Sequence, residues 1–281
     1  YLSSRTLCRK NKRIFSNITE SMTKMAPLPA LTNWNATRDS LHTIAQVVGS
    51  VQKSFIDPMP NALHLALHVT ANGIRTVPLR DNYDISVNFR DLHIKTRLLP
   101  EDDMPLNERT LATLHRNAQM LSGGDASDTA YDLQIDIGHA VQYAEALYRA
   151  YSALARFRAR LSGFMTPLVL WPHHFDLSFL VFGGKGSSAP DEHKDPHMNF
   201  GFAPFSDTID RPYFYAYAWP MPDGLLDDAL PAPAQWHTDG WQGARLDYDA
   251  VAGEDAPETV IEAALLGIHT RFARYTGMKK L

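Results

Sequence analysis

The sequence predicts an α+β fold, a mainly antiparallel sheet with helices packed on its apolar face, and the strand-like segments are the main reason. Residues 174–182, 197–202 and 213–219 alternate polar and apolar side chains with the period of two that a half-buried strand requires. Segments 37–56 and 137–161 instead repeat apolar residues at steps of three and four, as an amphipathic helix does. The apolar sides of both kinds of element can bury each other, which leaves the polar side of the sheet available for a site.

The first 25 residues differ in charge from the rest of the 281-residue chain. They hold six of the 27 basic residues and one of the 31 acidic residues, so residues 26–281 carry a net charge of −9. We expect 1–25 to be a leader outside the fold and 26–281 to form a single α+β domain. The leader has the composition of a transit peptide, but Tyr1 and the methionines at 22 and 25 favour upstream or vector-derived sequence. The acidic body argues against a nucleic-acid partner.

Cysteine content and hydropathy indicate the compartment. Cys8 is the one cysteine, so no disulfide can form within the chain, and a cytoplasmic location is expected. An organellar location is the alternative if 1–25 is a transit peptide. No run of about 18 apolar residues occurs, so we expect no membrane partner. No feature of the sequence indicates an oligomeric state.

Four helices are expected from the apolar spacing. The first carries His42 and Gln46 one turn apart, where they can present two polar tips side by side. In the long third helix, Glu145 is placed to pair with Arg149 one turn later. The ranges are 37–56, 107–121 with Leu111, Leu114 and Met120 on its apolar side, 137–161 and 257–275.

An antiparallel meander is expected over 62–97. Its turns are predicted at Asn72-Gly73, a type that needs positive φ, and at Arg90-Asp91. In its first strand, His64 and His68 would stand about 13 Å apart, too far to share one ion directly. The expected strands are 63–70, 74–77, 83–89 and 92–97, with a further short strand at 245–248.

The polar faces of the three strands that define the fold carry an unusual set of side chains. A face turned to bulk water is normally rich in Lys, Glu, Arg and Thr, whereas these faces contain no Lys or Glu. His, Tyr and Trp combine an apolar body with a polar tip and typically line a semi-enclosed cleft. The expected lining is His174, Asp176, Ser178, His197, Asn199, Tyr213, Tyr215, Tyr217 and Trp219.

Within this cleft, His174, Asp176 and His197 are the expected catalytic residues. His174 and Asp176 lie two apart on one strand, and His197 and Asn199 two apart on another, so they converge if the strands are neighbours about 5 Å apart. An Asp that fixes the tautomer of a His gives a general base, and a second His completes an acid–base pair or a metal site. The alternative is a set of satisfied polar residues on a structural sheet.

The loops between these strands contain no cofactor motif. Residues 183–188 are rich in Gly and Ser but lack the spacing of a phosphate loop, so we expect a flexible surface loop over 183–196. His193 and His197 have HxxxH spacing, but Pro196 disfavours a helix, and a solvated acidic loop is preferred to a metal site there. No nucleotide cofactor motif occurs. A divalent metal stays open as a cofactor.

A series of short motifs follows in a distinctive order. The motifs are Leu28-Pro-Ala-Leu-Thr-Asn-Trp34, Leu41-His42, Gln46-Val-Val-Gly49, Val69-Thr-Ala-Asn-Gly73, Phe157-Arg-Ala-Arg160, Phe175-Asp-Leu177, Gly201-Phe202 and Tyr215-Ala-Tyr-Ala-Trp-Pro220. This series resembles the landmarks of an uncharacterised family, domain of unknown function five-nine-nine-six, from about Leu28 to Gly277. The resemblance implies a shared architecture and no particular reaction. The positions it singles out are His42, Gln46, His64, Arg160, Asp176 and His197, and residues 123–136 look shorter than the family pattern.

Two functions stay open. The leading one is a small-molecule enzyme of unknown reaction that holds a small polar molecule in the His/Asp/Asn/Tyr-lined cleft, with or without a divalent metal. The alternative is a non-catalytic protein that uses the Tyr/Trp sheet face to hold a ligand or a partner. The expected ligand-binding residues are His42, Gln46, His64, Arg160, Asn199, Tyr215, Tyr217 and Trp219.

Overall fold

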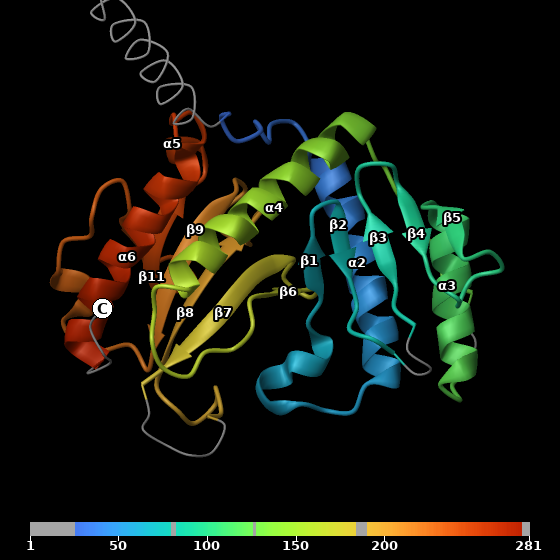
Figure 1. Cartoon of the computed structure of the whole chain (residues 1–281), viewed down its shortest axis with the longest axis horizontal. Coiled ribbons are helices and arrows are strands. Elements are labelled where there is room, and N and C mark those ends of the chain that lie inside the picture. Colours follow the sequence, from blue (N-terminus) through green and yellow to red (C-terminus); the bar gives the residue numbers. More distant parts are fainter. Residues whose placement is uncertain (1–25, 80–82, 126–127, 184–189, 277–281) are drawn as a thin grey trace, which may run out of the picture.

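The computed structural model describes residues 26–79, 83–125, 128–183 and 190–276. Within these ranges the fold is α+β, with two antiparallel sheets of five and six strands and helices packed against them (Figure 1). The predicted fold class is confirmed, with the strands divided between two sheets. The expected leader, 1–25, and residues 184–189 of the expected flexible loop lie outside the described residues.

The smaller sheet is a meander in which each strand pairs with the next along the chain. The predicted hairpin about Arg90-Asp91 is confirmed, because Asn88 pairs with His93 across it. The last strand of this sheet was not anticipated from the pattern. The strands are β1 (His68–Thr70), β2 (Gly73–Arg75), β3 (Ser86–Asn88), β4 (His93–Lys95) and β5 (Asp103–Pro105).

The predicted strand 63–70 is wrong over its first half. Residues Pro60–Leu65 form a 3₁₀ helix, η1, and pairing with β2 starts only at His68. Pro60 is at the start of η1, where proline's fixed φ suits the first turn of a helix. His64 therefore belongs to a helical turn rather than to a strand.

The first hairpin turn is displaced by one residue from its predicted position. Thr70 pairs with Gly73, so the turn residues are Ala71 and Asn72, and neither has a positive φ. Gly73 is required for space instead, because a Cβ atom there would lie 2.2 Å from the main-chain oxygen of Val87.

The larger sheet is built around the three predicted central strands, which are confirmed. They are neighbours, and shorter strands extend the sheet on both sides. The shorter strand β11 overlaps the predicted strand 245–248. In spatial order the strands are β10 (Gln235–His237), β11 (Gly243–Asp247), β9 (Tyr213–Trp219), β8 (His197–Ala203), β7 (Asp176–Phe182) and β6 (Val169–Trp171).

The predicted alternation assigns the two faces of this sheet correctly. Phe179 of β7 and Phe200 of β8 pack against Phe157 of α4 (Ile137–Arg158) on the apolar face. Every residue of β7 and β8 is nonetheless buried, including those on the polar face. The polar face of β7 and β8 is therefore largely covered by other parts of the chain.

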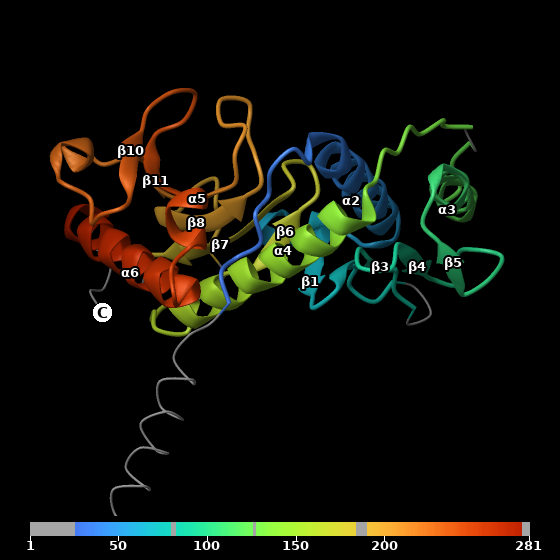
Figure 2. The same cartoon turned by 90° about the horizontal axis from the view of Figure 1, so that it is seen from above.

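The helices lie on both sides of the strands. Figure 2 shows α4 and α6 below β7 and β8 of the larger sheet. In the same view, α2 and α3 lie above the strands of the smaller sheet. Met120 is 62 % exposed, so its predicted place on the apolar side of α3 is wrong. None of the described helices has the length and apolarity needed to cross a bilayer. The remaining bounds are α2 (Asn35–Phe55), α3 (Glu108–Leu121), α5 (Asp249–Ala252), α6 (Pro257–Thr276) and the 3₁₀ helix η3 (Leu225–Asp227).

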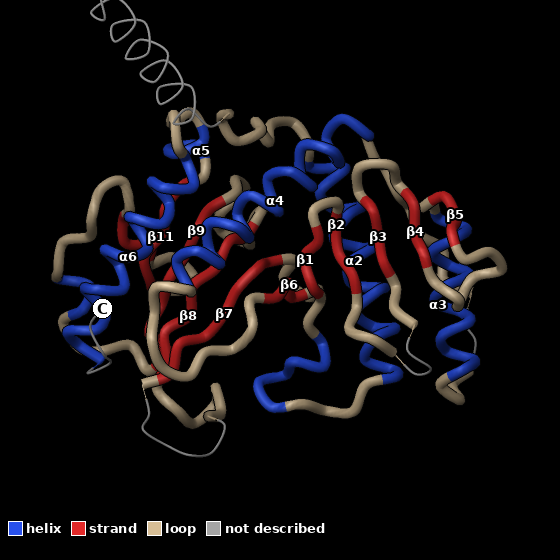
Figure 3. The backbone as a smooth tube through the Cα atoms, in the orientation of Figure 1, coloured by secondary structure: helices blue, strands red, loops and turns tan. Residues whose placement is uncertain are grey.

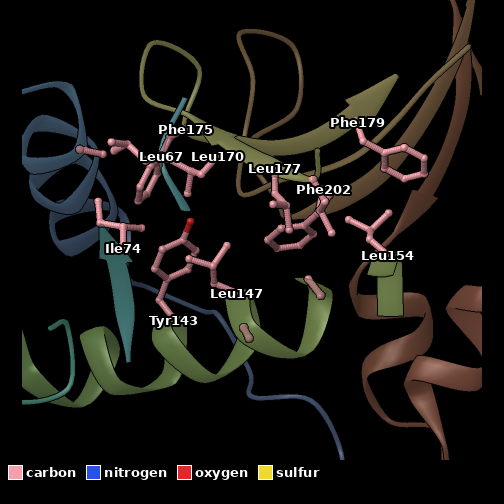
Figure 4. Close-up of a cluster of buried hydrophobic side chains, with 14 of the residues drawn as sticks. Leu67, Ile74, Tyr143, Leu147, Leu154, Leu170, Phe175, Leu177, Phe179 and Phe202 are labelled. Carbon is pink, nitrogen blue, oxygen red and sulfur yellow. The ribbon is translucent and has the colours of Figure 1, made fainter. Parts of the chain in front are cut away.

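The two sheets meet edge to edge. Leu67, just before β1, and Leu170 of β6 exchange two main-chain hydrogen bonds of 2.8 Å, and β1 and β6 lie side by side in Figure 3. A buried apolar cluster extends from one half into the other. Tyr143 of α4 lies at the junction, with its ring 5.2 Å from that of Phe175 (Figure 4). Helix α4 thus supports both sheets at once.

Arg149 connects α4 to two other elements. The predicted pair with Glu145 is present at 3.9 Å, but the closer partner is the buried carboxylate of Glu258 in α6, to which Arg149 Nε donates. The two terminal nitrogens of Arg149 donate to the main-chain oxygens of Ala26 and Pro27 at 2.7 Å. A single guanidinium group therefore fixes α6 and the beginning of the described chain.

Candidate functional site

A cavity of about 770 Å³ lies on the polar face of the larger sheet. Strands β6 to β9 contribute to it, together with the turn 172–175, the loop 205–208 and residues 240–241. Its size suits a small organic molecule. Six of the eleven predicted site residues line it, namely His42, His174, Asp176, Asn199, Tyr215 and Tyr217.

Asp176 contributes a buried carboxyl group, with 9 % of the residue exposed. Its Oδ2 atom accepts a hydrogen bond from the Tyr215 hydroxyl, and its Oδ1 atom has no hydrogen-bond partner among the described residues. Burial raises the pKa of Asp176 above its ordinary value, against the opposing effects of Tyr215 and of His174 nearby. A carboxyl group with a raised pKa exchanges its proton more readily at the pH of the cell, as a general acid–base group must.

Tyr215 reaches Asp176 across an intervening strand. It pairs with Gly201 of β8, which pairs in turn with Ser178 of β7. The Tyr215 ring occupies the space above Gly201 that any other side chain would fill. Burial, followed by the negative charge of Asp176, raises the pKa of Tyr215 well above its ordinary value. The hydroxyl group therefore keeps its proton and acts as the donor.

Two further side-chain pairs organise the polar face. Asn199 Nδ2 donates to the Tyr217 hydroxyl at 2.8 Å, and Trp171 Nε1 donates to Ser178 Oγ at 2.9 Å. Asn199 is buried, and its Oδ1 atom has no hydrogen-bond partner in the described part of the chain. With Asp176 Oδ1, this makes two buried acceptors that a bound molecule with hydrogen-bond donors would satisfy.

Histidines gather at one end of the cavity, at the turn between β6 and β7. The turn runs from Pro172 to Phe175, with Phe175 in the left-handed conformation at φ 59°. His42 of α2 donates from Nε2 to the Pro172 oxygen at 3.0 Å, and its ring stacks on Phe175. The rings of His173 and His174 lie 4.3 Å apart. Burial lowers the pKa of both His42 and His173, which favours neutral imidazoles.

His197 lies far from the other two predicted catalytic residues, so the expected three-residue group is corrected. His174 is in the turn that precedes β7 rather than in the strand. In the hairpin of β7 and β8, His197 pairs with Phe182, which is about 20 Å along the strand from Asp176. The ring of His197 stacks on Trp219 instead, with centroids 5.6 Å apart. The residues share a sheet face, but antiparallel pairing places them at opposite ends of it.

The other predicted ligand-binding residues lie outside the cavity lining. Gln46 is exposed on α2, and His64 lies in η1. Arg160 donates to Glu262 of α6 at 2.8 Å, in an exposed ion pair. Trp219 is 40 % exposed at the end of β9. These residues have ordinary structural or surface positions.

Several lining residues were missed by sequence reasoning. Trp171 lies in a short apolar strand without alternation, so nothing identified its orientation. Phe205 and Trp241 lie in loops, where side chains follow no period. His173 had a usable signal, because it adjoins His174 directly after Pro172 and a turn there presents both imidazoles.

No three His, Cys, Asp or Glu side chains within the described ranges come close enough together to hold a metal ion. In the turn before β8, the Asp191 carboxylate accepts a hydrogen bond from the main-chain nitrogen of His193 and pairs with Lys194 at 2.9 Å. The side chain of His193 is 83 % exposed. These contacts are those of a solvated acidic loop.

Comparison with known families identifies the relationship. A family model described as Family of unknown function (DUF5996) matches residues 26–145 and 124–277. The protein belongs to this family. DUF5996 is also the family that the motif series resembles, so the resemblance is confirmed. No match is found to a curated protein or to a solved structure.

The two DUF5996 matches cover both halves of the fold. The first includes α2, α3 and the smaller sheet, and the second includes the larger sheet and α6. His42 comes from the first match, whereas Asp176 and Tyr215 come from the second. The cavity is thus assembled from both matched segments of a DUF5996 chain.

Proposed function

We propose that this DUF5996 protein is an enzyme that binds a small polar molecule in the cavity and uses Asp176 as its acid–base group. The observation that supports the proposal is the carboxyl group of Asp176, which is buried, hydrogen-bonded through one oxygen to Tyr215 and without a partner at the other among the described residues. A buried carboxyl group with an unsatisfied oxygen costs stability. Groups that cost stability in this way concentrate where a protein uses them.

The proposed chemistry is a reversible proton transfer. Ionised Asp176 takes a proton from an O–H or N–H group of the bound molecule and becomes the neutral acid, which returns the proton in the reverse step. Tyr215 donates to the carboxyl group and fixes its orientation. His174 lines the same cavity and is exposed, so it can exchange the proton with water.

The second candidate is a non-catalytic ligand-binding protein. The aromatic character of the cavity favours it, because Trp171, Tyr213, Tyr217 and Trp241 all contribute to the lining. Stacking on such side chains can hold a ligand without any chemistry. The two candidates differ in one measurable property, since only the enzyme converts what it binds.

Turnover of an unfractionated small-molecule mixture tests the proposal. The full chain, its Asp176→Asn variant and an Asp57→Asn control are each incubated with a metabolite extract, which is then analysed by mass spectrometry. Asp57 is exposed and does not line the cavity. We expect a compound that the wild type and the control consume, with consumption lowered at least about 100-fold in Asp176→Asn.

The other outcomes have definite meanings. If the wild type retains compounds on ultrafiltration and none of the three proteins converts them, the protein is a binding protein. If no compound of the extract is consumed and none is retained with the protein, both candidate functions are overturned.

We infer a cytoplasmic site of action and no nucleic-acid partner. The first rests on the absence of cysteine from residues 9–281, and the second on the net charge of −9 carried by residues 26–281. Cell fractionation tests the location, and recovery of the protein in an organelle fraction would contradict it. Electrophoretic mobility of DNA and RNA probes tests the second inference, which a shifted band would contradict.

A further inference from the structure

The charged side chains that line the cavity all belong to acidic residues or histidines. Within the described chain, the lining includes the carboxyl groups of Asp176, Glu192 and Asp207 and contains no Lys or Arg. A phosphate or carboxylate group bound here would therefore find no permanent positive charge to pair with. An anionic ligand would also face repulsion from the carboxylates.

Two guanidinium groups near the cavity, those of Arg38 and Arg245, are engaged by carboxylates elsewhere. Arg38 lies behind Phe205, with its Cζ atom 4.2 Å from the centre of that ring. It pairs with Asp39 at 2.8 Å and with Asp210 at 2.7 Å. Two carboxylates thus neutralise Arg38, and its charge is separated from the cavity by a phenyl ring.

Arg245 approaches from the neighbouring strand, where it is the cross-strand partner of Tyr215. It pairs with Asp247 at 2.6 Å. Burial lowers the pKa of His42 and His173, which favours the neutral form of these two lining imidazoles. With three carboxyl groups and no Lys or Arg among its described lining residues, the cavity is an acidic environment.

The hydrogen-bonding groups of the floor indicate the same polarity. Asp176 and Asn199 are each more than nine-tenths buried, and each retains an acceptor oxygen without a donor among the described residues. Both residues line the cavity. A ligand that supplies donors, and in particular donors that carry positive charge, would compensate the buried carboxyl group of Asp176.

Aromatic rings complete a site of this character. Tyr213 stacks on Trp241 at 6.1 Å, and Tyr215 meets Trp241 edge to face at 6.1 Å. The faces of indole and phenol rings attract cations through the ring quadrupole. An aromatic wall beside a buried carboxyl group is therefore suited to an organic ammonium group.

We propose that the ligand of this cavity is an organic cation, a molecule with a primary or secondary ammonium group held at Asp176 and an organic body packed against Tyr213 and Trp241. The inference rests on the proposed function of the same cavity and specifies its substrate class. It excludes phosphorylated compounds and carboxylic acids without an amine. A neutral hydroxyl group can donate to the same oxygens, but it leaves the carboxylate charge uncompensated.

Three probes of similar size and different charge test the inference. These are 2-phenylethylamine, 2-phenylethanol and phenylacetate, titrated calorimetrically into the full chain at pH 7. We expect the amine to bind at least about 10-fold more tightly than the alcohol, because a charged donor forms a stronger hydrogen bond to a buried carboxylate than a neutral donor does. We expect the acid to show no binding. Asp176→Asn should remove the advantage of the amine, whereas Asp57→Asn should retain it.

The remaining results would overturn the inference without deciding the proposed function. Binding of the alcohol or the acid as tight as that of the amine would show that charge is not what the cavity selects. Binding of the amine that is unchanged in Asp176→Asn would place it elsewhere, and binding of none of the three probes would also be contrary to the inference. In each case, turnover of the metabolite extract by the wild type and by Asp176→Asn still decides whether the cavity is catalytic.

Discussion

Tyr215 lies directly over Gly201, and a Cβ atom at position 201 would come within 2.4 Å of Tyr215 Cζ. Because position 201 of β8 has no side chain, Tyr215 on β9 can reach Asp176 on β7. Strand β9 contributes the hydrogen-bond donor, β8 contributes the space above Gly201, and β7 contributes the acceptor. The central hydrogen bond of the cavity depends on this arrangement.

Gly201→Ala should displace the Tyr215 ring and break its hydrogen bond to Asp176. We expect a loss of about 1–3 kcal/mol in the free energy of unfolding, as for other overpacked sites, and loss of turnover or binding in the cavity. Chemical denaturation gives the first quantity. Gly253→Ala is the control, because a Cβ atom there meets nothing within 4 Å, and its effect should stay within about 0.5 kcal/mol. Equal stability of the two variants would show that both Tyr215 and the main-chain oxygen of Leu177, which would lie 2.6 Å from the new Cβ atom, can move aside.

Asp176→Asn should raise the melting temperature at pH 7. The pKa of Asp176 is raised in the folded state above the ordinary value of 3.8, so above pH 3.8 the folded protein binds more protons than the unfolded one. Stability therefore falls as the pH rises through the window between 3.8 and the folded pKa. The asparagine side chain does not titrate in this range. The difference in melting temperature between the variant and the wild type should therefore shrink as the pH falls towards about 4. A variant that melts below the wild type at pH 7 would contradict this prediction.

Two buried tyrosines should respond differently to loss of their hydroxyl groups. Tyr143 and Tyr248 are both fully buried, but the Tyr143 hydroxyl has no hydrogen-bond partner among the described residues, whereas that of Tyr248 donates to the Pro29 oxygen at 2.8 Å. We expect Tyr143→Phe to be neutral or stabilising by up to about 1 kcal/mol, and Tyr248→Phe to cost about 1 kcal/mol. The order of the two midpoints in urea checks the prediction, and the reverse order would refute it.

Arg149→Met should be among the most destabilising substitutions on α4. The side chain of Glu258 is 3 % exposed, and its carboxylate pairs with Arg149. Removal of Arg149 therefore leaves a buried charge without compensation. Such losses cost about 3–5 kcal/mol. Arg156→Met is the control, because Arg156 is 44 % exposed beside Glu262 and should contribute less than about 1 kcal/mol. The double variant Arg149→Met with Glu258→Met should recover most of the loss.

His269 should make the fold sensitive to acid. It lies in the core between Phe157 and Phe200, its Nδ1 atom has no partner among the described residues, and burial lowers its pKa below the ordinary 6.5. The unfolded chain then binds more protons than the folded one, so stability falls as the pH drops below 6.5 towards the folded pKa. We expect His269→Leu to lose less stability than the wild type between pH 7 and pH 5, measured by denaturation at each pH. Parallel losses would show that other histidines carry the effect.

The sequence predicted the faces of the sheet better than positions along it. Alternation identifies which side of a strand Asp176 and His197 occupy, because Leu177 and Met198 must be buried. The alternation carries no information about how far apart along the strands the two residues lie. That position is determined by the connection, and a hairpin from β7 to β8 necessarily places the beginning of one strand beside the end of the other.

The parts of the cavity that come from loops were beyond the reach of periodicity. Phe205 and Trp241 enter the lining through turns, and their orientation depends on contacts that form only after the sheet has assembled. The 3₁₀ helix at Pro60–Leu65 was missed for a similar reason. The buried amide of Gln52 donates to the main-chain oxygens of His64, within this helix, and of Ala66, directly after it, at 2.9 and 2.8 Å, a tertiary contact that no local pattern predicts.

The junction at Leu67 and Leu170 also protects the protein from its own strands. A separate sheet of five strands and another of six would each present an open edge, with unpaired main-chain groups ready to bind a strand of another molecule. Here β1 and β6 cover each other through that residue pair. Partial separation of the two halves would expose the edges at β1 and β6 at once, in addition to those at β5 and β10, and would give strands of other molecules two more places to pair.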